Sequence, residues 1–303
     1  MRILNLLITI ILFSSLSVAV LRCNLHQRDR ASNNYPQPTP DFAALPFLPG
    51  IVTSDSLDFN AAFSPDRSKF YFCRSRKGKW MMYFTEHRGE TWTQPVVAPF
   101  NESAYSQADP FFSKDGTLYY ISNRPRHQGD SLANYDIWFI RPKEDGSWTQ
   151  PENLTIVNSD STEYYVSLAD NGNLYFSSDR QGTRGSHDIY VSRYVNGSYT
   201  TPENLGSSIN SANMEHDPMI CPDEQFLIFT SVDRADSHGS ADLYFSLRQE
   251  DGSWAPARNM GDKFNTETYE YCSYLSPDQK YLFYSTTEDV KWISTSLLPW
   301  KTK

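Results

Sequence analysis

The sequence predicts an all-β protein built from repeated small antiparallel sheets, and three observations support this. A turn of the type Pro-Asp, Asp-Gly or Asn-Gly recurs along the chain at intervals of roughly 50 residues, a period typical of repeat architectures. Short runs of aromatic and β-branched residues flank each turn, in a chain with 19 Tyr, 18 Phe and 7 Trp. Turn residues interrupt these runs so often that no long helix is expected after the N-terminal segment.

The first two units are recognised by their turns, Ser64–Asp66 and Lys114–Gly116. In the second unit, strands are expected over Leu118–Tyr120 and Asp136–Trp138. The first unit has Arg74–Arg76 but no Asp-apolar-aromatic run like that of the second unit, so its second turn is not defined by the sequence.

The third unit shows the complete pattern of four strands. Asp170–Gly172 and Asn196–Gly197 form its two turns, because Asn and Gly accept the positive φ of a tight hairpin. The expected strands are Val166–Leu168, Asn173–Ser177, Asp188–Ser192 and Ser198–Leu205. Four antiparallel strands per unit is the content of one blade of a β-propeller.

The fourth unit repeats this pattern with the turn Cys221–Asp223 and strands over Phe226–Phe229 and Asp242–Tyr244. The last unit has the turn Ser276–Asp278 and strands over Tyr281–Tyr284 and Lys291–Ser294, but its fourth strand is missing.

The N-terminal region can supply this missing strand. Leu48–Val52 resembles the exit of a fourth strand, as in Asn204–Gly206, so an N-terminal strand is expected to close the last blade and cover its edge. The sequence therefore predicts a β-propeller of five four-stranded antiparallel blades. Six blades are the alternative if the two ends fold into a degenerate one.

Several segments resemble the WD40-like Pro-Asp repeat of TolB-type propellers. They are Phe111–Tyr120 with Asp136–Trp138, and Ser177–Arg180 with Asp188–Tyr190. The resemblance covers nearly the whole mature chain and implies an exported propeller that binds something on one face. TolB-like proteins also carry an α/β domain, for which this sequence has no room, so a role in the Tol system is not implied.

The N-terminal segment is expected to export the protein. Residues 1–22 have the apolar run Ile3–Leu21 of a signal peptide or N-terminal anchor. Cleavage after Ala19, lipidation at Cys23 as a lipoprotein, and an uncleaved anchor are the alternatives, and each implies a periplasmic or secreted domain. Residues 23–46 are polar and contain Pro, as in a tether, and residues 47–300 form the propeller.

Charge and motifs restrict the function. A net charge of −9 and a pI near 5.2 argue against nucleic acid, whose phosphates require clustered Lys and Arg. The motifs Gly-x-Ser-x-Gly, His-Glu-x-x-His and the phosphate loop are absent, which favours a protein that is not an enzyme and has no cofactor. Membrane contact is expected only through the N-terminal segment. Cys73, Cys221 and Cys272 are expected to be buried thiols.

One repeated position gives the predicted ligand site. Each unit has a carboxyl or amide side chain eight residues before its turn, near the start of the innermost strand, where five blades bring them around one channel mouth. This acidic column is Asp58, Gln107, Glu163, Glu215 and Glu270, with His216 beside it. The structural alternative is that the carboxylates are paired or bound to a cation, because unpaired carboxylates around one channel would repel one another.

Two further columns have structural interpretations. Asn101, Asn158, Asn210 and Asn265 are expected to hold a turn in the preceding loop. Arg124, Arg180 and Arg234 are expected to bond across one loop to Asp136, Asp188 and Asp242.

Histidines and tyrosines in the loops of the same face add two alternatives. His127, His187, His216 and His238 suggest a divalent metal site, although their spacing is not a ligand motif. Tyr105, Tyr164, Tyr165, Tyr269 and Tyr271 offer aromatic surface for a sugar or a peptide.

The sequence therefore predicts an exported, non-catalytic propeller that binds a protein, peptide or glycan at this channel mouth. The alternative is a carbohydrate-active enzyme. It would be either a glycosidase using Glu163 and Glu215 as its carboxyl pair, or a metal-assisted lyase using the histidines.

Overall fold

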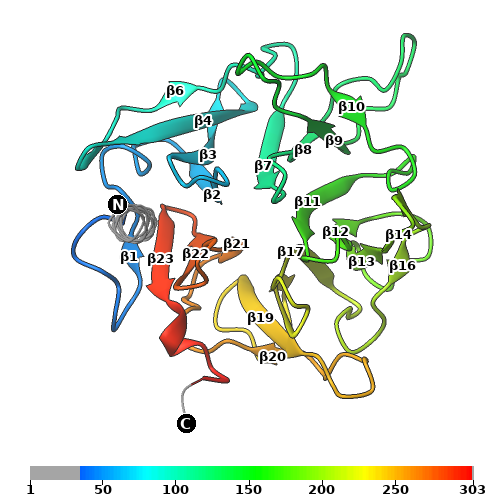
Figure 1. The fold of residues 1–303 in the computed structure, drawn as a ribbon. Coiled ribbons are helices and arrows are strands. Elements are labelled where there is room, and N and C mark those ends of the chain that lie inside the picture. Colours follow the sequence, from blue (N-terminus) through cyan, green and yellow to red (C-terminus); the bar gives the residue numbers. More distant parts are fainter. Residues whose placement is uncertain (1–34, 302–303) are drawn as a thin grey trace, which may run out of the picture. The chain divides into compact units, whose positions relative to one another are not determined.

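The computed structural model describes residues 35–301, and the chain from Pro40 onward forms one compact unit. In this unit, five antiparallel sheets surround a central axis, with their first strands innermost (Figure 1). Within the described residues, the helical content is one short 3-10 helix at Thr295–Leu297. The predicted all-β propeller with five four-stranded blades is confirmed.

The first four blades follow the chain from the axis outward. Blade 1 contains β2 (Asp58–Phe63), β3 (Lys69–Arg76), β4 (Lys79–Arg88) and β6 (Val96–Val97), and β5 (Thr91–Trp92) pairs with the end of β4. Blade 2 contains β7 (Gln107–Phe112), β8 (Leu118–Ser122), β9 (Asp136–Ile140) and β10 (Glu152–Asn153). Blade 3 contains β11 (Glu163–Leu168), β12 (Leu174–Ser178), β13 (Asp188–Ser192) and β16 (Glu203–Asn204). Blade 4 contains β17 (Met214–Ile220), β18 (Phe226–Val232), β19 (Ala241–Leu247) and β20 (Arg258–Asn259).

Blade 5 is completed by the N-terminal strand, as predicted. It contains β21 (Tyr271–Leu275), β22 (Tyr281–Ser285), β23 (Val290–Ser294) and β1 (Leu45–Pro46). The strand therefore lies in the last two residues of the predicted tether. Phe47 follows it, is fully buried, and packs on Phe70 of blade 1 and Phe283 of blade 5 at ring distances of 4.6 and 4.9 Å. This aromatic cluster joins the first and last blades.

Two local features differ from the expectation. In blade 3, the expected strand Ser198–Leu205 is divided: β15 (Ser198–Tyr199) pairs with β14 (Tyr194–Val195) in a separate hairpin, and only β16 joins the blade. In blade 1, the undefined turn is Lys77-Gly78, whose φ values of 53° and 74° suit a two-residue hairpin.

Every innermost strand has an irregularity in its pairing with the second strand, and each contains one residue with positive φ. This residue lies two positions after the acidic column. The five bulge residues are Asn60, Asp109, Tyr165, Asp217 and Cys272. Because they lie on the strands nearest the axis, their side chains determine what occupies the centre of the propeller.

The core lies between neighbouring blades. For example, Tyr175 and Val191 of blade 3 pack with Leu227 and Phe229 of blade 4. Cys73, Cys221 and Cys272 are free and buried, as expected. Residues 35–301 include no helix with the length and apolar character needed to cross a bilayer. The predicted export segment, residues 1–22, lies outside the described residues.

Candidate functional site

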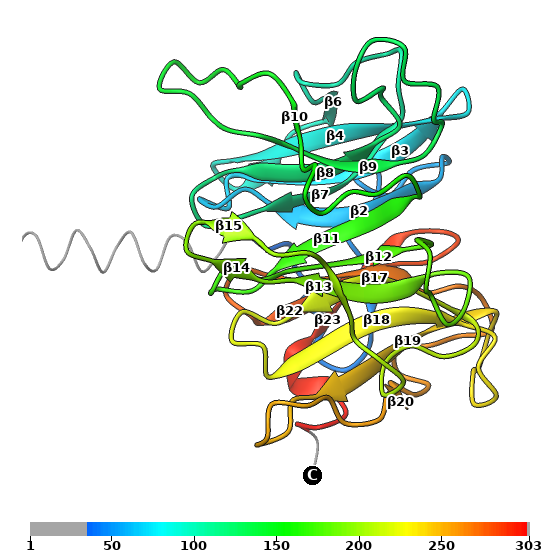
Figure 2. The same ribbon diagram turned by 90° about the vertical axis from the view of Figure 1, so that its right-hand side faces the viewer.

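The propeller has two faces at its axis. Antiparallel pairing brings the starts of the innermost strands and the loops between second and third strands to one face, which we call the entry face. The Pro-Asp and Asp-Gly turns lie on the opposite turn face. Figure 2 shows the blades from the side, with the β14–β15 hairpin and the loops of both faces.

The acidic column is buried, and its carboxylates are hydrogen-bonded within the protein. Glu215 accepts hydrogen bonds from the backbone N–H and hydroxyl of Ser211 at 2.8 and 2.6 Å, and from the Ser231 hydroxyl at 2.7 Å. The Arg234 guanidinium completes this set at 2.9 Å. Glu163 has the same arrangement with Ser159, Ser178 and Arg180.

The other members of the column also accept hydrogen bonds from groups of the protein. Asp58 is bonded by Ser54 and Arg74, and Glu270 by Thr266 and Thr268. Gln107 accepts the backbone N–H of Glu102 at 2.6 Å. The column thus fastens the loop that precedes each innermost strand. Its role in ligand binding stays a prediction, as does a glycosidase that uses Glu163 and Glu215.

The asparagine column holds the loops, as expected. Each side-chain amide pairs with the backbone N–H and carbonyl of one residue, as a peptide group of a neighbouring strand would. Asn210 accepts the backbone N–H of Ile189 at 2.8 Å and donates to the carbonyl of the same residue at 3.0 Å. Asn101, Asn158 and Asn265 do the same for Met82, Ile137 and Leu243.

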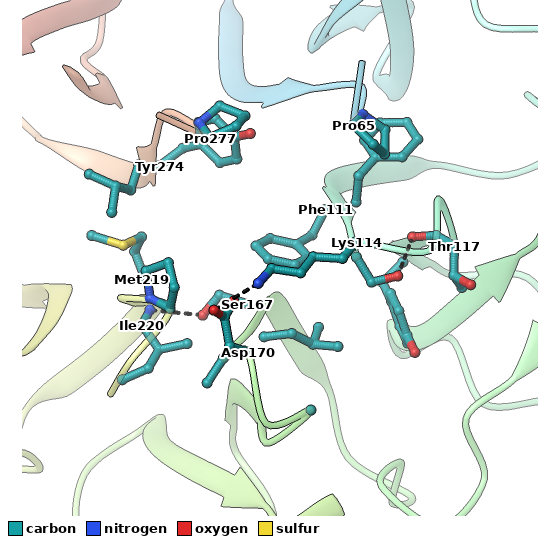
Figure 3. Close-up of a pocket in the computed structure, with 18 of the residues that line it drawn as sticks. Pro65, Phe111, Lys114, Thr117, Ser167, Asp170, Met219, Ile220, Tyr274 and Pro277 are labelled. Atoms are coloured by element: carbon teal, nitrogen blue, oxygen red, sulfur yellow. Dashed lines mark hydrogen bonds and ion pairs between the residues drawn. The ribbon is translucent and has the colours of Figure 1, made fainter. Parts of the chain in front are cut away.

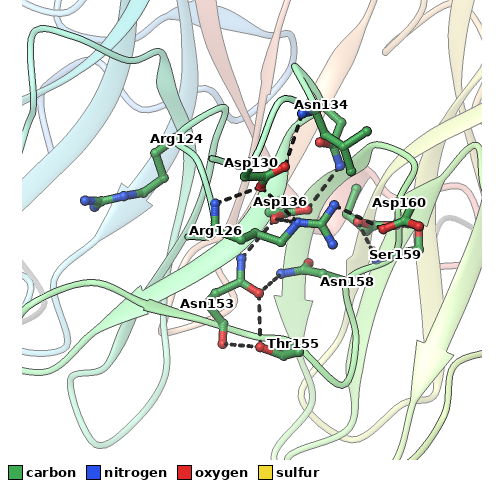
Figure 4. Close-up of polar contacts among 12 residues, drawn as sticks. Arg124, Arg126, Asp130, Asn134, Asp136, Asn153, Thr155, Asn158, Ser159 and Asp160 are labelled. Carbon is green, nitrogen blue, oxygen red and sulfur yellow. Dashed lines mark hydrogen bonds and ion pairs between the residues drawn. The ribbon is translucent and has the colours of Figure 1, made fainter. Parts of the chain in front are cut away.

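The expected pairing of arginine with aspartate across the loop is wrong. Arg180 and Arg234 bind the acidic column, and Arg124 binds Glu102. Asp188 and Asp242 instead accept backbone N–H groups of their own loops. In blade 2, Arg126 lies among the carboxylates of Asp130, Asp136 and Asp160 at 3.5, 3.2 and 3.4 Å, and Arg124 points away from them (Figure 4).

The four histidines have different surroundings. His127 is bonded to the neighbouring Gln128 carbonyl, and His238 to Asp242. His216 is buried and contacts Asp217 at 3.1 Å and the Tyr269 hydroxyl at 2.7 Å. Both ring nitrogens of His187 lack partners within residues 35–301. In the same range, no three His, Cys, Asp or Glu residues are grouped to hold a metal ion.

Aromatic rings from all five blades form a collar on the entry face. Its centroid distances are 5.1 Å for Trp80–Tyr135, 5.6 Å for Tyr135–Tyr164, 5.5 Å for Tyr164–His187, 5.9 Å for His216–Tyr269, 5.6 Å for Tyr269–Tyr271, 6.3 Å for Tyr271–Phe59 and 5.8 Å for Phe59–Trp80. Between His187 and His216 the connection runs through the backbone: the His187 carbonyl accepts the N–H of Glu215, the neighbour of His216, at 3.0 Å. We call these eight residues the collar.

Most collar rings are only partly covered by protein. Phe59 and His216 are buried, whereas the other six are half-buried and so retain surface for a ligand. A flat aromatic face with an adjacent polar edge suits ligands that are apolar on one side and hydroxylated on the other.

Two carboxyl groups lie deeper in the propeller than the collar. Asp109 accepts the Tyr165 N–H at 3.1 Å, and Asp217 accepts the Cys272 N–H at 3.0 Å, so both bulge residues connect blades. Their side chains are almost buried, at 7% and 6% exposure. Asn60 accepts the Asp109 N–H at 3.3 Å through Oδ1, and its Nδ2 has no partner among the described residues.

The pKa values of the two carboxyl groups are shifted in opposite directions. Burial, followed by the charge of Asp217, raises the pKa of Asp109 to about 7. For Asp217, burial opposes ionisation, but the charge and hydrogen bond of His216 and the bonds from Cys272 leave its pKa lowered. Asp109 is therefore close to the midpoint of its titration at neutral pH, whereas Asp217 favours the ionised form, a combination that suits acid and base chemistry.

The turn face holds a cavity of about 560 Å³ with walls from all five blades, among them Pro65, Phe111, Tyr165, Met219 and Tyr274 (Figure 3). Asp109 and Asp217 are not part of its lining. The cavity and the titrating carboxyls are therefore separate features, and we place the candidate functional site at the collar, where the polar chemistry lies.

Sequence reasoning identified only part of this site. Tyr164, Tyr269, Tyr271, His187 and His216 were candidates and are brought together in the collar. Tyr165 turns inward, and Tyr105 lies against Arg124 instead. Phe59, Trp80, Tyr135, Asp109 and Asp217 were missed. The available signal for the two aspartates was variation: their position two residues after the acidic column differs in chemistry from blade to blade.

Comparisons with known proteins agree on the fold. No family model matches the sequence, and no curated protein matches it. Among solved structures, it is similar to an endo-arabinase from Bacteroides thetaiotaomicron VPI-5482, with a TM-score of 0.53 and 16% identity over 84% of this chain and 97% of that one. It is also similar to a thermostable family-43 glycoside hydrolase, with a TM-score of 0.50 and 10% identity over 86% and 91%.

TolB from Acinetobacter baumannii is a further similar structure, with a TM-score of 0.47 and 14% identity over 80% of this chain and 55% of that one. This chain thus spans about half of TolB. The two structures with TM-scores of 0.53 and 0.50 show, at 16% and 10% identity, similarity of the fold alone. Membership of the WD40-like Pro-Asp repeat family stays a prediction.

Proposed function

We propose that this protein is an exported binding module that takes a neutral glycan at the collar. The observation that carries the proposal is the group of eight aromatic residues from all five blades, six of them half-buried, around a polar centre. The apolar face of a sugar ring would stack on rings such as Trp80 and Tyr135. Sugar hydroxyls would donate to Asp109 and Asp217.

The charges favour a neutral glycan over the other ligand classes. Asp217 is ionised and Asp109 is close to it, and the whole chain has a net charge of −9, so an anionic ligand such as a polyuronide would be repelled. A peptide offers roughly one backbone N–H per residue, whereas a sugar ring offers several hydroxyl donors to a centre rich in acceptors.

Export and location belong to the same proposal. The apolar run Ile3–Leu21 would direct the domain to the periplasm or the exterior, with membrane contact only through this segment. Extracellular glycans would then be within reach of the collar.

A binding screen with matched variants tests the proposal. Purified protein is titrated by calorimetry with neutral oligosaccharides, uronide oligosaccharides and peptides, and we expect binding of a neutral oligosaccharide. Trp80→Ala and Tyr135→Ala should each weaken it roughly 3- to 10-fold, the size of a lost aromatic contact. Tyr194→Ala removes a 44% exposed ring on the other face and should leave affinity unchanged. Equal loss in Tyr194→Ala, or preference for uronides or peptides, would contradict the proposal.

Glycoside hydrolysis is a second candidate, favoured by the opposite pKa shifts of the two carboxyl groups, which are raised for Asp109 and lowered for Asp217. Asp109 would protonate the glycosidic oxygen as the C–O bond breaks. Asp217 would take the proton from the water that attacks the sugar carbon, so two hydroxylated products form.

Turnover distinguishes the two candidates. Asp109→Asn and Asp217→Asn should abolish release of reducing ends while the collar still binds the oligosaccharide. If the unmodified protein binds a glycan without cleaving it, the enzymatic candidate is excluded and the binding module stands.

A further inference from the structure

We propose that the cavity on the turn face is a second site, which binds a small uncharged aromatic molecule. This inference is independent of the collar, because it concerns the opposite mouth of the propeller. A volume of about 560 Å³ lies within the range of roughly 300 to 1,000 Å³ typical of small-molecule sites.

Aromatic residues form much of the cavity lining. They come from blades 1, 2, 3 and 5, and include Phe63, Phe111, Tyr119, Tyr194, Tyr199 and Tyr274. Figure 3 shows Phe111 near the middle of the lining residues, with Met219 and Ile220 of blade 4 opposite. Rings in several orientations allow an aromatic guest to make edge-to-face contacts.

The charged groups of the lining are already paired, which argues against a charged ligand. Lys114 contacts Asp170 at 2.7 Å, a pair drawn in Figure 3, and Arg141 contacts Glu152 at 2.7 Å. Asp115 accepts the Ser113 hydroxyl and the Thr117 N–H. A charged guest would lose hydration without gaining a free counter-charge.

The polar groups at the axial end of the cavity indicate one hydrogen bond to the guest. The Tyr165 hydroxyl donates to the Ser273 carbonyl. The Ser167 hydroxyl donates to the Pro218 carbonyl and accepts from the Ile220 N–H. Ser273 is fully buried and lines the cavity, and its Oγ has no partner among the described residues. A hydroxyl or carbonyl on the guest would supply that partner.

Three simple probes test the charge preference by ligand-observed NMR on the full chain: p-cresol, benzoate and benzylamine. We expect p-cresol to bind in the millimolar range or tighter, and the two ions at least 10-fold more weakly. The inference would be overturned if benzoate or benzylamine bound with the same affinity as p-cresol. It would also be overturned if p-cresol did not bind at a 10-fold higher concentration.

Variants test the place of binding. Leu168→Trp fills the cavity from a partly exposed position and should abolish p-cresol binding, whereas Leu132→Trp, at an exposed position outside the lining, should not. Ser273→Ala should weaken p-cresol several-fold without affecting toluene, which lacks the hydroxyl. Unchanged p-cresol binding in folded Leu168→Trp and Ser273→Ala would place the probe elsewhere and overturn the inference.

Discussion

The Tyr165 hydroxyl donates a 2.6 Å hydrogen bond to the Ser273 carbonyl and so connects blades 3 and 5, which are not neighbours in the ring. Tyr165 is a bulge residue with φ of 48°, and this conformation directs a large side chain toward the axis. Both residues of this bond line the cavity on the turn face.

Removing this bond should destabilise the whole propeller. Tyr165→Phe deletes the hydroxyl without changing the shape of the ring and is expected to cost about 1–3 kcal/mol, because the buried carbonyl loses its donor. Urea unfolding measures the change. Tyr194→Phe, at an exposed ring, is the control and should change the free energy of unfolding by less than ~0.5 kcal/mol. Equal effects of the two variants would show that the bond across the axis adds no stability.

Closure by the N-terminal strand depends on Phe47. Phe47→Ala removes a fully buried ring that packs on both the first and last blades, and it should cost about 3–5 kcal/mol. The matched control is Phe42→Ala, because Phe42 is 90% exposed and should contribute almost nothing. Thermal unfolding with the same midpoint in both variants would contradict the closure.

The acidic column should act on stability through its loops. Glu215→Gln keeps the size of the side chain but weakens the bonds from Arg234 and Ser211, at an expected cost of about 1.5–3 kcal/mol. Glu203→Gln, in an exposed pair with Arg193, should cost less than ~1 kcal/mol. If Glu215→Gln is as stable as the unmodified protein but loses glycan affinity, the column is part of the binding site.

The repeat made most of the fold predictable, and the same regularity obscured the site. Turns such as Asp170–Gly172 identify blades because their φ requirement is local. The column containing Glu215 was equally easy to recognise in the sequence. It repeats because each blade needs a side chain that holds the loop before its innermost strand. The placement of Asp109 and Asp217 depends on strand bulges and on contacts between blades, which no short sequence motif marks. Only comparison of the same position in all five units could have singled them out. Trp80 was hidden because the first unit lacks the strand pattern of the others.

Stability should depend on pH through Asp109. Its pKa is raised from 3.8 to about 7 in the folded state, so the folded protein retains a proton that the unfolded chain releases between these values. The free energy of unfolding therefore falls as pH rises from about 4 to 7. Asp109→Asn removes this loss and should raise the thermal midpoint at pH 8 while leaving it nearly unchanged at pH 4.

Asp217→Asn is the matched variant with the opposite sign. Burial opposes the ionisation of Asp217, but His216 and the hydrogen bonds from Cys272 leave its pKa lowered, so its ionised form stabilises the fold above the pKa of the unfolded chain. Its replacement should lower the midpoint at pH 8. Equal shifts of the two variants at both pH values would show that the two groups do not titrate as described.

The most direct test of the glycan-binding proposal is a crystal structure with a neutral oligosaccharide that binds in solution. We predict a sugar ring stacked on Trp80 or Tyr135 within the collar, with hydroxyls directed at Asp109 and Asp217. A sugar found only on the turn face, or on the outer strands with the collar empty, would contradict the proposal.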